Sequence, residues 1–328
     1  MKPNVAIQPK KQGHYWQRTW MLYLMLILPM AFFTLFRYVP MTNIVIAFKD
    51  YNIFRGVWQS EWVGFKWFQR TFEWKNFPNS IGGFFNATRN SNMPDFYVAL
   101  KNTLTLNILD LLMGFPAPII LAILLNELSF KRYKKLTQTV VYLPHFLSWI
   151  IIAGIATQLF APSGGVINIM LGKMGVGPID FLMKNGLWVG TYIGLGVWKE
   201  MGWGTIIYLA AITGINPELY EAAEVDGAGR FRKIWNVTLP GIRPTIVVLL
   251  IMNMGRILGS EFDRPYTMAN PTVMKVADVI STLVYRVGIR SSQFSLTAAI
   301  GLFQSVVCVI FIIAANIIAK KSGERGIW

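Results

Sequence analysis

Two groups of polar residues stand out in this otherwise strongly apolar sequence. The first is the charged stretch from Glu221 to Arg230, which lies between two long apolar segments. The second group lies inside or just beyond apolar segments and comprises Trp198, Lys199, Glu200, Trp203, Asn253, Arg256 and Glu261. Polar groups are costly in a bilayer, so those found there are candidates for function. The first group predicts a docking site for a soluble protein, and the second predicts a path for a polar substrate.

The charged stretch carries local signals for a helix that ends in a tight turn. Asn216 is a good N-cap, and Pro217 fits the first helical position. The carboxylates that follow favour the positive end of the helix dipole, and Gly227 supplies the backbone freedom that a turn requires. A second short helix is expected over 230–239, with Pro240 ending it. An amphipathic helix pair lying on lipid headgroups is the alternative interpretation, although acidic residues and alanines are poor lipid anchors.

Composition places the chain in a membrane. Hydrophobic residues make up 54% of the 328 residues, charged residues only 14%, and the mean hydropathy is +0.44. A soluble domain of this size could not bury so much apolar surface. The single cysteine, Cys308, excludes a disulfide framework or a cysteine-based metal cluster and is expected to be a small packing residue.

The apolar segments predict an all-α integral membrane protein with six spanning helices, since about 20 apolar residues cross a bilayer. The expected spans are 20–47, 98–125, 137–160, 187–213, 243–260 and 294–318. They form one unit, 20–318, between a basic arm (1–19) and a short tail (319–328). The polar segment 216–240 joins the fourth and fifth spans. No internal repeat or second domain is evident.

Basic residues near the ends of the spans predict orientation, because cytoplasmic flanks are rich in Lys and Arg. Lys131, Arg132, Lys134 and Lys135 fall between the second and third spans, and Lys320 and Lys321 follow the sixth. Both termini, the connection between the second and third spans and the segment 216–240 are therefore expected in the cytoplasm. The net charge of +15 is scattered over these flanks, which favours anionic lipids and not nucleic acid as a partner.

Several kinds of chemistry are absent from the sequence. There is no phosphate-binding loop, so the chain is not expected to hydrolyse ATP itself. His14 and His145 are the only histidines and predict no metal site. His145, after Pro144, is expected to pack at a helix end and not to act as a catalyst. No nucleophile or paired-carboxylate constellation supports a membrane-embedded enzyme.

The string Glu221-Ala222-Ala223-x-x-Asp226-Gly227-Ala228, with Ile234 and Leu239-Pro240 downstream, resembles the EAA loop of binding-protein-dependent ABC importer permeases. Further motifs resemble the carbohydrate branch, which includes permeases for lipo-oligosaccharide, pectin fragments and alginate. These are Tyr38-Val39-Pro40-Met41, Ala47-Phe48-Lys49-Asp50-Tyr51, Lys101-Asn102-Thr103, Tyr142-Leu143-Pro144-His145, Phe262-Asp263 and Asn270-Pro271. The resemblance covers nearly the whole chain, and it implies a place in the cytoplasmic (inner) membrane of a bacterium.

The resemblance implies that the segment 216–240 forms a coupling helix in a groove of a cytoplasmic ATPase. Glu221 would then pair with a basic residue of the ATPase, and Ala222 and Ala223 would permit close approach. Gly227 would make the turn, which Asp226 would cap or brace. The implied partners are a second, homologous permease forming a heterodimer, two ATPase subunits and an extracytoplasmic binding protein. ATP and Mg²⁺ would bind to the ATPase, and this chain would hold no cofactor.

The candidate substrate residues allow two interpretations. Trp198 and Trp203 could stack on sugar rings, or they could belong to the interfacial belt. Lys199 and Glu200 are sequence neighbours and do not face each other on a helix, so at least one should point into a cavity or toward another helix. A Lys–Glu bridge between helices is the alternative. Lys199 and Arg256 would suit a sugar carrying carboxylates, and the resemblance implies import of oligosaccharides.

The segment 49–95 is rich in aromatic residues, namely Trp58, Trp62, Trp67, Phe68, Phe72 and Trp74. On the outer face it is a natural resting place for a binding protein, and a packed cap over the helices is an equal alternative. An ion-coupled secondary carrier for sugars is the other functional class considered. Such carriers usually show related halves, which this sequence lacks.

Overall fold

The computed structural model describes residues 13–73, 95–259, 261–323 and 326–327, with side chains from Thr19 onward. Predicted features at residues 1–12 and at Trp74 lie outside this part of the chain. The described residues are predominantly helical, as predicted. Two short strands pair antiparallel, with Lys49 opposite Trp62 and Asp50 opposite Glu61.

The elements follow one another along the chain. The first half comprises α1 (Gly13–Phe33), the π-helix η1 (Thr34–Tyr38), α2 (Val39–Met41), the 3₁₀-helix η2 (Thr42–Phe48), β1 (Lys49–Asp50), α3 (Gly56–Gln59), β2 (Glu61–Trp62), α4 (Lys66–Thr71), α6 (Asp95–Gly114), α7 (Pro116–Asn126), α8 (Lys131–Tyr142), the 3₁₀-helix η4 (Leu143–Phe146) and α9 (Trp149–Leu159). The second half comprises α10 (Val166–Lys173), α11 (Asn185–Thr213), α12 (Pro217–Val225), α13 (Arg230–Lys233), the π-helix η5 (Ile234–Thr238), α14 (Leu239–Met254), α15 (Asp263–Met268), α16 (Met274–Ala277), α17 (Ile280–Val284), the π-helix η6 (Tyr285–Arg290) and α18 (Phe294–Lys321).

Four helical stretches of the described chain are long and apolar enough to cross a membrane. They are Thr19–Phe48, Asp95–Asn126, Arg230–Met254 and Phe294–Lys321. A fifth span results if the bent pair Lys131–Phe146 and Trp149–Leu159 is counted as one. The fourth predicted span, 187–213, coincides with α11, a single helix of 29 residues that is not among these candidates.

The third predicted span, 137–160, is not one straight helix. Its two halves meet at 102°. Pro144 lies in the tight turn η4, and Leu147 is extended. Ser148 then starts α9 by accepting a hydrogen bond from the backbone N–H of Ile151 at 3.4 Å. A proline and a new N-cap therefore interrupt the helix within a sequence that is continuously apolar.

The prediction that Pro240 ends a short helix is wrong. Residues 230–254 form one helical stretch, which passes through Pro240 and ends before the predicted residue 260. Proline removes a backbone donor and crowds the carbonyl four residues earlier. The wider π-helical turn η5 ends two residues before Pro240, and η1 likewise ends two residues before Pro40. The wider turn thus lets the helix continue past the proline.

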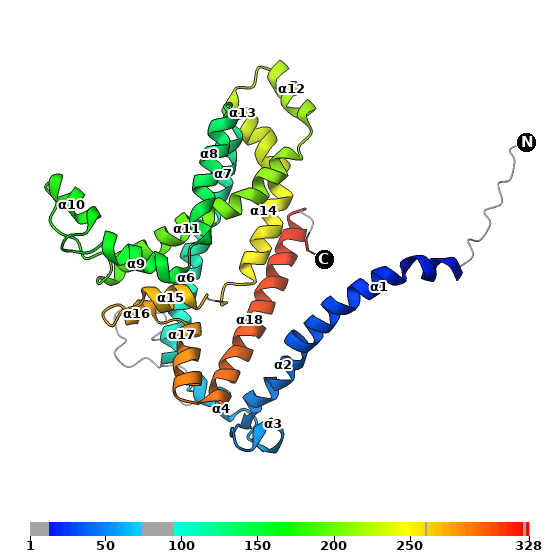
Figure 1. Ribbon diagram of the computed structural model, residues 1–328, viewed down its shortest axis with the longest axis vertical. Coiled ribbons are helices and arrows are strands. Elements are labelled where there is room, and N and C mark those ends of the chain that lie inside the picture. The colour runs from blue at the N-terminus through cyan, green and yellow to red at the C-terminus, as the bar shows by residue number, and fades with distance from the viewer. Residues whose placement is uncertain (1–12, 74–94, 260, 324–325, 328) are drawn as a thin grey trace, which may run out of the picture.

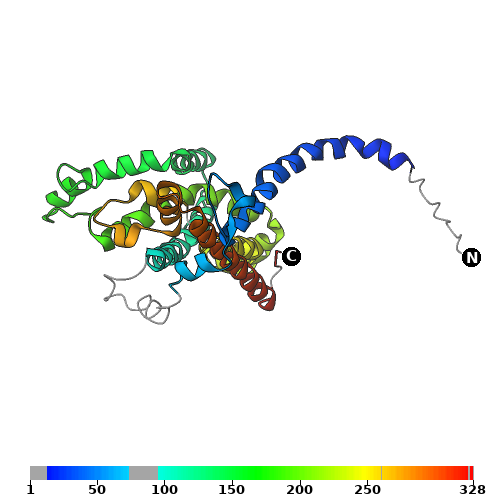
Figure 2. The same ribbon diagram turned by 90° about the horizontal axis from the view of Figure 1, so that it is seen from below.

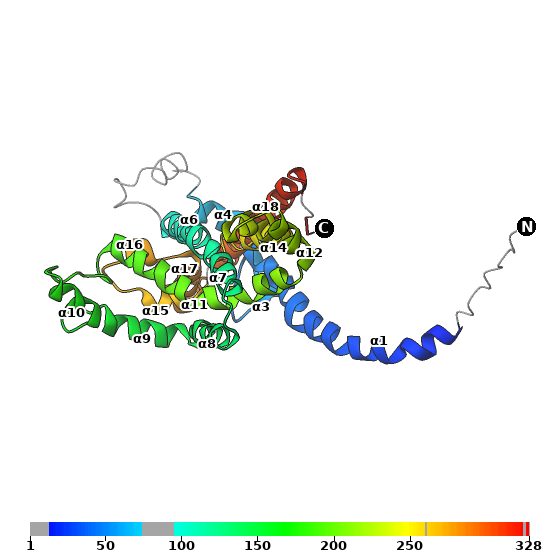
Figure 3. The same cartoon turned by 90° about the horizontal axis from the view of Figure 1, so that it is seen from above.

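Figure 1 shows that α12 lies at one end of the long axis of the molecule, next to α13, which follows it in the chain. The cap formed by α3 and α4 lies at the opposite end. α18 starts at the cap and runs back toward the end that carries α12. α1 stands away from the other helices in all three views, and its residues from Trp20 onward are exposed (Figures 2 and 3).

The interior is built from several clusters of buried side chains, and the one that supports the candidate site joins α6, α9, α11 and the segment 268–279. Trp188 of α11 is fully buried in it and donates an Nε1 hydrogen bond of 2.9 Å to the carbonyl of Met268. Leu106 of α6 and Trp149 of α9 belong to the same cluster. These contacts fix the relative positions of α6, α11 and the end of α15, three of the elements that contribute to the polar site.

Candidate functional site

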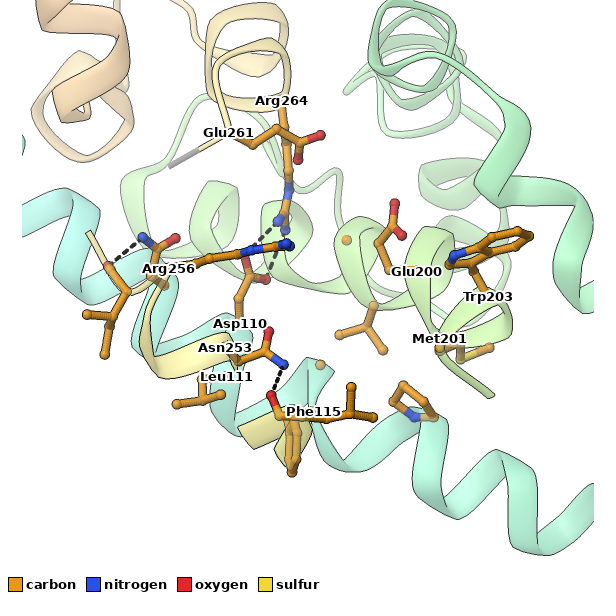
Figure 4. A pocket seen from close by; sticks show the side chains of 18 of the residues that line it. Asp110, Leu111, Phe115, Glu200, Met201, Trp203, Asn253, Arg256, Glu261 and Arg264 are labelled. Carbon is orange, nitrogen blue, oxygen red and sulfur yellow. Dashed lines mark hydrogen bonds and ion pairs between the residues drawn. The ribbon is translucent and has the colours of Figure 1, made fainter. Parts of the chain in front are cut away.

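A cavity of about 460 Å³ lies between α6–α7, α11, α14 and the segment that leads to α15 (Figure 4). Its volume falls in the range of small-molecule sites. Five of the seven residues predicted for a substrate path line it, namely Glu200, Trp203, Asn253, Arg256 and Glu261. The sequence therefore identified residues from three separate segments that the fold brings to one cavity.

Trp198 and Lys199 do not line this cavity. Lys199 is buried and donates a 2.6 Å hydrogen bond to the backbone carbonyl of His145. Lys199 therefore satisfies a backbone carbonyl at the break between α8 and α9. It is not the substrate-facing cation that the sequence suggested.

The expectation that Lys199 and Glu200 do not face each other is wrong. Lys199 Nζ lies 3.3 Å from Glu200 Oε1, because both side chains are long enough to bend toward the same neighbour. That neighbour is His145, whose Nδ1 lies 2.9 Å from Glu200 Oε2. The second part of the expectation is confirmed, since Glu200 lines the cavity and Lys199 reaches another helix.

The imidazole of His145 lies flat against Trp203. The ring centroids are 4.5 Å apart and the planes differ by 4°. Trp203 is 46% exposed, so its indole packs on one side and remains accessible at the cavity. His145 packs at a helix end, as predicted, and it also contacts two residues that line the cavity.

Arg256 and Asn253 lie at the C-terminal end of α14 and the turn that follows it. Asn253 donates its amide to the carbonyl of Leu249 at 2.8 Å. Arg256 is exposed, and its side chain extends into the cavity (Figure 4). Within the part of the chain that the structure describes, no carboxylate forms an ion pair with Arg256, whereas the cavity's other cation forms an ion pair with Asp110.

That other cation is Arg264, which sequence reasoning missed together with its partner Asp110. Arg264 Nη1 and Nη2 donate to the two oxygens of Asp110 at 2.6 and 3.1 Å, and Nη2 also donates to the carbonyl of Tyr192 at 2.6 Å. Its guanidinium carbon lies 3.7 Å from the centre of the Tyr192 ring. This arrangement ties α6, α11 and α15 together on the cavity wall (Figure 4).

Glu261 continues the polar wall and accepts a 2.9 Å hydrogen bond from Trp149 Nε1. Asn107 of α6 also lines the cavity and donates to the carbonyl of Ile257 at 2.7 Å. No group of three His, Cys, Asp or Glu side chains among the described residues could hold a metal ion. Among the described residues, the wall therefore offers hydrogen-bonding groups, one cation without an ion pair and an aromatic surface.

The predicted docking segment forms α12, at the end of the molecule. Asn216 caps it by accepting a 3.1 Å hydrogen bond from the N–H of Glu218, and Pro217 occupies the first turn. Glu221 and Ala222 are exposed, and Ala223 is half-buried. The helix start predicted from the sequence is thus confirmed, and the acidic and alanine residues remain accessible.

The turn after α12 depends on Gly227, whose φ is +73°. The N–H of Gly227 donates to the carbonyl of Glu224 at 3.0 Å, and that of Ala228 donates to the carbonyl of Ala223 at 2.8 Å. This pair of bonds is the Schellman arrangement, which requires a left-handed residue at the glycine. Asp226 is the last residue before the turn and is exposed.

Two side-chain contacts brace α12 against the helical stretch that follows it. The hydroxyl groups of Tyr220 and Thr238 lie 3.0 Å apart, and Lys233 donates to Glu224 at 2.9 Å. The Lys233 ammonium holds the pKa of the Glu224 carboxyl below its ordinary value, through this hydrogen bond and through its charge. α12 is therefore attached to the base of the 230–254 helix.

Comparison with known proteins supplies an independent line of evidence. Residues 99–323 match the family described as binding-protein-dependent transport system inner membrane component. The chain is 44% identical over 307 residues to the polygalacturonan/rhamnogalacturonan transport system permease protein YteP of Bacillus subtilis, covering 94% of this chain and 90% of the relative. It is 45% identical, also over 307 residues, to the protein LplB of the same organism, covering 94% and 91%.

Solved structures show the same similarity. A crystal structure of a bacterial alginate ABC transporter in complex with an alginate pentasaccharide-bound periplasmic protein contains a chain that is 38% identical. The two chains superpose with a TM-score of 0.82 over 97% of this chain and all of the other. A second structure of an importer for the acidic polysaccharide alginate gives a TM-score of 0.78 over 95% of this chain and 99% of that chain, with 38% identity.

Proposed function

The chain belongs to the binding-protein-dependent transport system inner membrane components, and from this membership we propose that it is the permease subunit through which an ABC importer carries acidic oligosaccharides. The observation that carries the proposal is the cavity between α6, α11 and α14, with Arg256 unpaired in it among the described residues. An ion-coupled secondary carrier is disfavoured, because the family delivers its substrates through a binding protein.

The cavity wall fits the chemistry of a sugar. The hydroxyl groups of a sugar ring can donate to the carboxylates of Glu200 and Glu261. Its apolar C–H face can pack on the exposed part of Trp203, and aromatic surfaces contribute binding energy through such packing. Asn253 adds an amide next to these groups. The wall therefore combines an apolar surface with polar groups in fixed positions, as ligand sites do.

Arg256 argues for a carboxylate on that sugar. A guanidinium binds a carboxylate through two parallel hydrogen bonds, which are stronger than bonds between neutral groups. Arg264 is already occupied by Asp110, and Lys199 is buried away from the cavity. Arg256 is thus the described lining residue that can offer a charged donor to an acidic sugar. The relatives named for polygalacturonan and alginate transport are consistent with this assignment.

We assign α12 as the segment that couples the permease to a separate ATPase, which would bind ATP and Mg²⁺. Glu221 and Ala222 face solvent at the end of the molecule, where a second protein can reach them. The Tyr220–Thr238 and Glu224–Lys233 contacts connect α12 to the helix 230–254, whose C-terminal end contributes Asn253 to the cavity. A displacement of α12 would thereby move the helix 230–254 and, with it, the cavity wall at Asn253.

The complete importer would contain a second permease subunit, two ATPase subunits and an extracytoplasmic binding protein. With six spans, including the bent pair and α11, both termini would lie on the cytoplasmic side with α12. The cap at the opposite end would then face the binding protein. Its exposed aromatic residues, among them Phe54, Trp58 and Trp62, offer an apolar surface there, whereas Trp67 is buried as a packing residue.

The coupling role is tested by co-purification. Glu221→Lys is expected to release the ATPase from the complex, because it replaces the exposed acid of α12 with a cation. Glu61→Lys, at an exposed acid of the cap, is the matched control and should leave the ATPase bound. Retention of the ATPase and unimpaired uptake in Glu221→Lys would exclude α12 as the coupling segment.

The substrate class is tested by ATPase turnover of the reconstituted complex in the presence of its binding protein. Tetragalacturonate is expected to stimulate hydrolysis, and a neutral tetrasaccharide such as maltotetraose is expected to stimulate it less. Equal stimulation by both sugars would contradict the preference for acidic cargo.

A further inference from the structure

The break between α8 and α9 lies against α11, next to the cavity. A break in a membrane span exposes backbone groups that need polar partners. Lys199 supplies one of them, since its ammonium donates to the carbonyl of His145 at 2.6 Å. Ser148 supplies another at the start of α9. The residues before the break are therefore anchored to one turn of α11, the turn that also carries Glu200 and Trp203.

The side chain of His145 contacts both of these cavity residues. Its Nδ1 lies 2.9 Å from Glu200 Oε2, and its ring lies parallel to the indole of Trp203 at 4.5 Å. The contact with Glu200 fixes the plane of the imidazole, and the imidazole then covers one face of the indole. Only the rest of the Trp203 surface is left for the cavity, where Figure 4 shows the ring beside Glu200.

We propose that His145 is a positioning residue that holds Trp203 in the orientation needed to pack on a sugar ring in the cavity. The proposal rests on the proposed function. An indole half exposed on a helix would otherwise exchange between rotamers, and ordering it at each binding event would weaken binding. The contact with His145 removes that freedom before the sugar arrives.

Two substitutions separate the contact of His145 with Glu200 from its contact with Trp203. His145→Asn places an amide near the position of Nδ1 and removes the ring. His145→Phe keeps a ring against the indole and removes the polar atom. ATP-driven uptake of tetragalacturonate by proteoliposomes that contain the whole complex gives KM and the maximal rate. We expect His145→Asn to raise KM about 3- to 10-fold, the range that corresponds to one aromatic pair, and His145→Phe to raise it less than about 2-fold by the same reasoning.

A double substitution distinguishes positioning from simple packing. Trp203→Ala removes the indole, so adding His145→Asn to it should raise KM by less than about 2-fold, because the contact is already lost. The proposal would be overturned if the rise in KM of the double variant equalled the product of the rises in the two single variants. An equal KM in His145→Asn and His145→Phe would also overturn it. Each variant is first checked for assembly by co-purification of the ATPase.

A second measurement does not depend on transport. Electron cryomicroscopy of the assembled complex should show the Trp203 indole displaced in His145→Asn and unmoved in His145→Phe. An unmoved indole in both variants would overturn the positioning role. If the wild-type complex fails to take up tetragalacturonate, the proposed cargo is wrong, and the position of the indole still decides the role of His145.

Discussion

Arg264 binds Asp110 through both terminal guanidinium nitrogens, Nη1 and Nη2, at 2.6 and 3.1 Å, although the two residues are 154 positions apart in the sequence. Both lie in the wall of the cavity, and the arginine is additionally stacked on Tyr192. Its Nε is buried without a hydrogen-bond partner among the described residues. The pair therefore joins α6 to α15 across the surface of α11 and fixes the shape of the site.

Arg264→Ala should destabilise the protein by about 3 kcal/mol, because loss of one partner leaves a largely buried carboxylate unpaired. Denaturant-induced unfolding in detergent measures the change. Lys66→Ala is the control, since Lys66 and Asp50 form a 3.0 Å pair with 54% and 47% of their side chains exposed, and such pairs contribute less than about 1 kcal/mol. Similar losses in the two variants would argue against the structural role of the Arg264–Asp110 pair.

The residues of α12 and its turn and the polar residues of the cavity differ in how far the sequence could predict them. The cap at Asn216 and the turn at Gly227 depend on neighbours within a few residues, so local rules predicted them. Asn253 and Arg256 were found because polar residues inside an apolar segment are unusual. Asp110 gives the same signal within the span predicted at 98–125 and was missed.

The partnerships between residues were not predictable. Arg264 reaches Asp110, and Lys199 reaches His145, only through packing of helices that are distant in sequence. The bend after η4 has a local cause in Pro144, but its direction depends on contacts with α11. The assignment of Lys199 to the substrate path failed for the same reason, since sequence cannot tell which side of a mostly apolar helix faces the cavity.

Gly196 is needed for the Arg264 contact. A β-carbon at this position would overlap the guanidinium of Arg264, which is buried and held by Asp110 and Tyr192. Gly196→Ala should therefore displace the arginine and destabilise the protein by about 1–3 kcal/mol, the usual cost of overpacking. Gly194→Ala, two residues earlier on α11, meets no atom within 4 Å and should be close to neutral.

Thermal unfolding of the two variants in the same detergent checks this expectation. A lower melting temperature for Gly196→Ala alone would support it. Equal melting temperatures would mean that the side chain of Arg264 can move away from an added β-carbon, and that its contacts with Asp110 and Tyr192 do not hold it in one position.

Gly227→Ala should weaken the turn after α12 by about 1 kcal/mol, because φ is +73° there and a side chain disfavours this conformation. Gly229→Ala is the matched control, since Gly229 has a φ of −68° and an added β-carbon meets nothing within 4 Å. Binding of the ATPase to the permease, measured by titration in detergent, should fall for Gly227→Ala only. Equal affinities for both variants would show that the shape of the turn does not matter for docking.

Arg256 provides the most direct test of the account. ATP-driven uptake of tetragalacturonate and of maltotetraose is measured in proteoliposomes that contain the wild-type complex or Arg256→Gln. We predict that Arg256→Gln raises KM for tetragalacturonate about tenfold or more, as loss of a charge-assisted bond requires, and leaves uptake of the neutral sugar unchanged. An unchanged KM for tetragalacturonate, or an equal rise for both sugars, would contradict it.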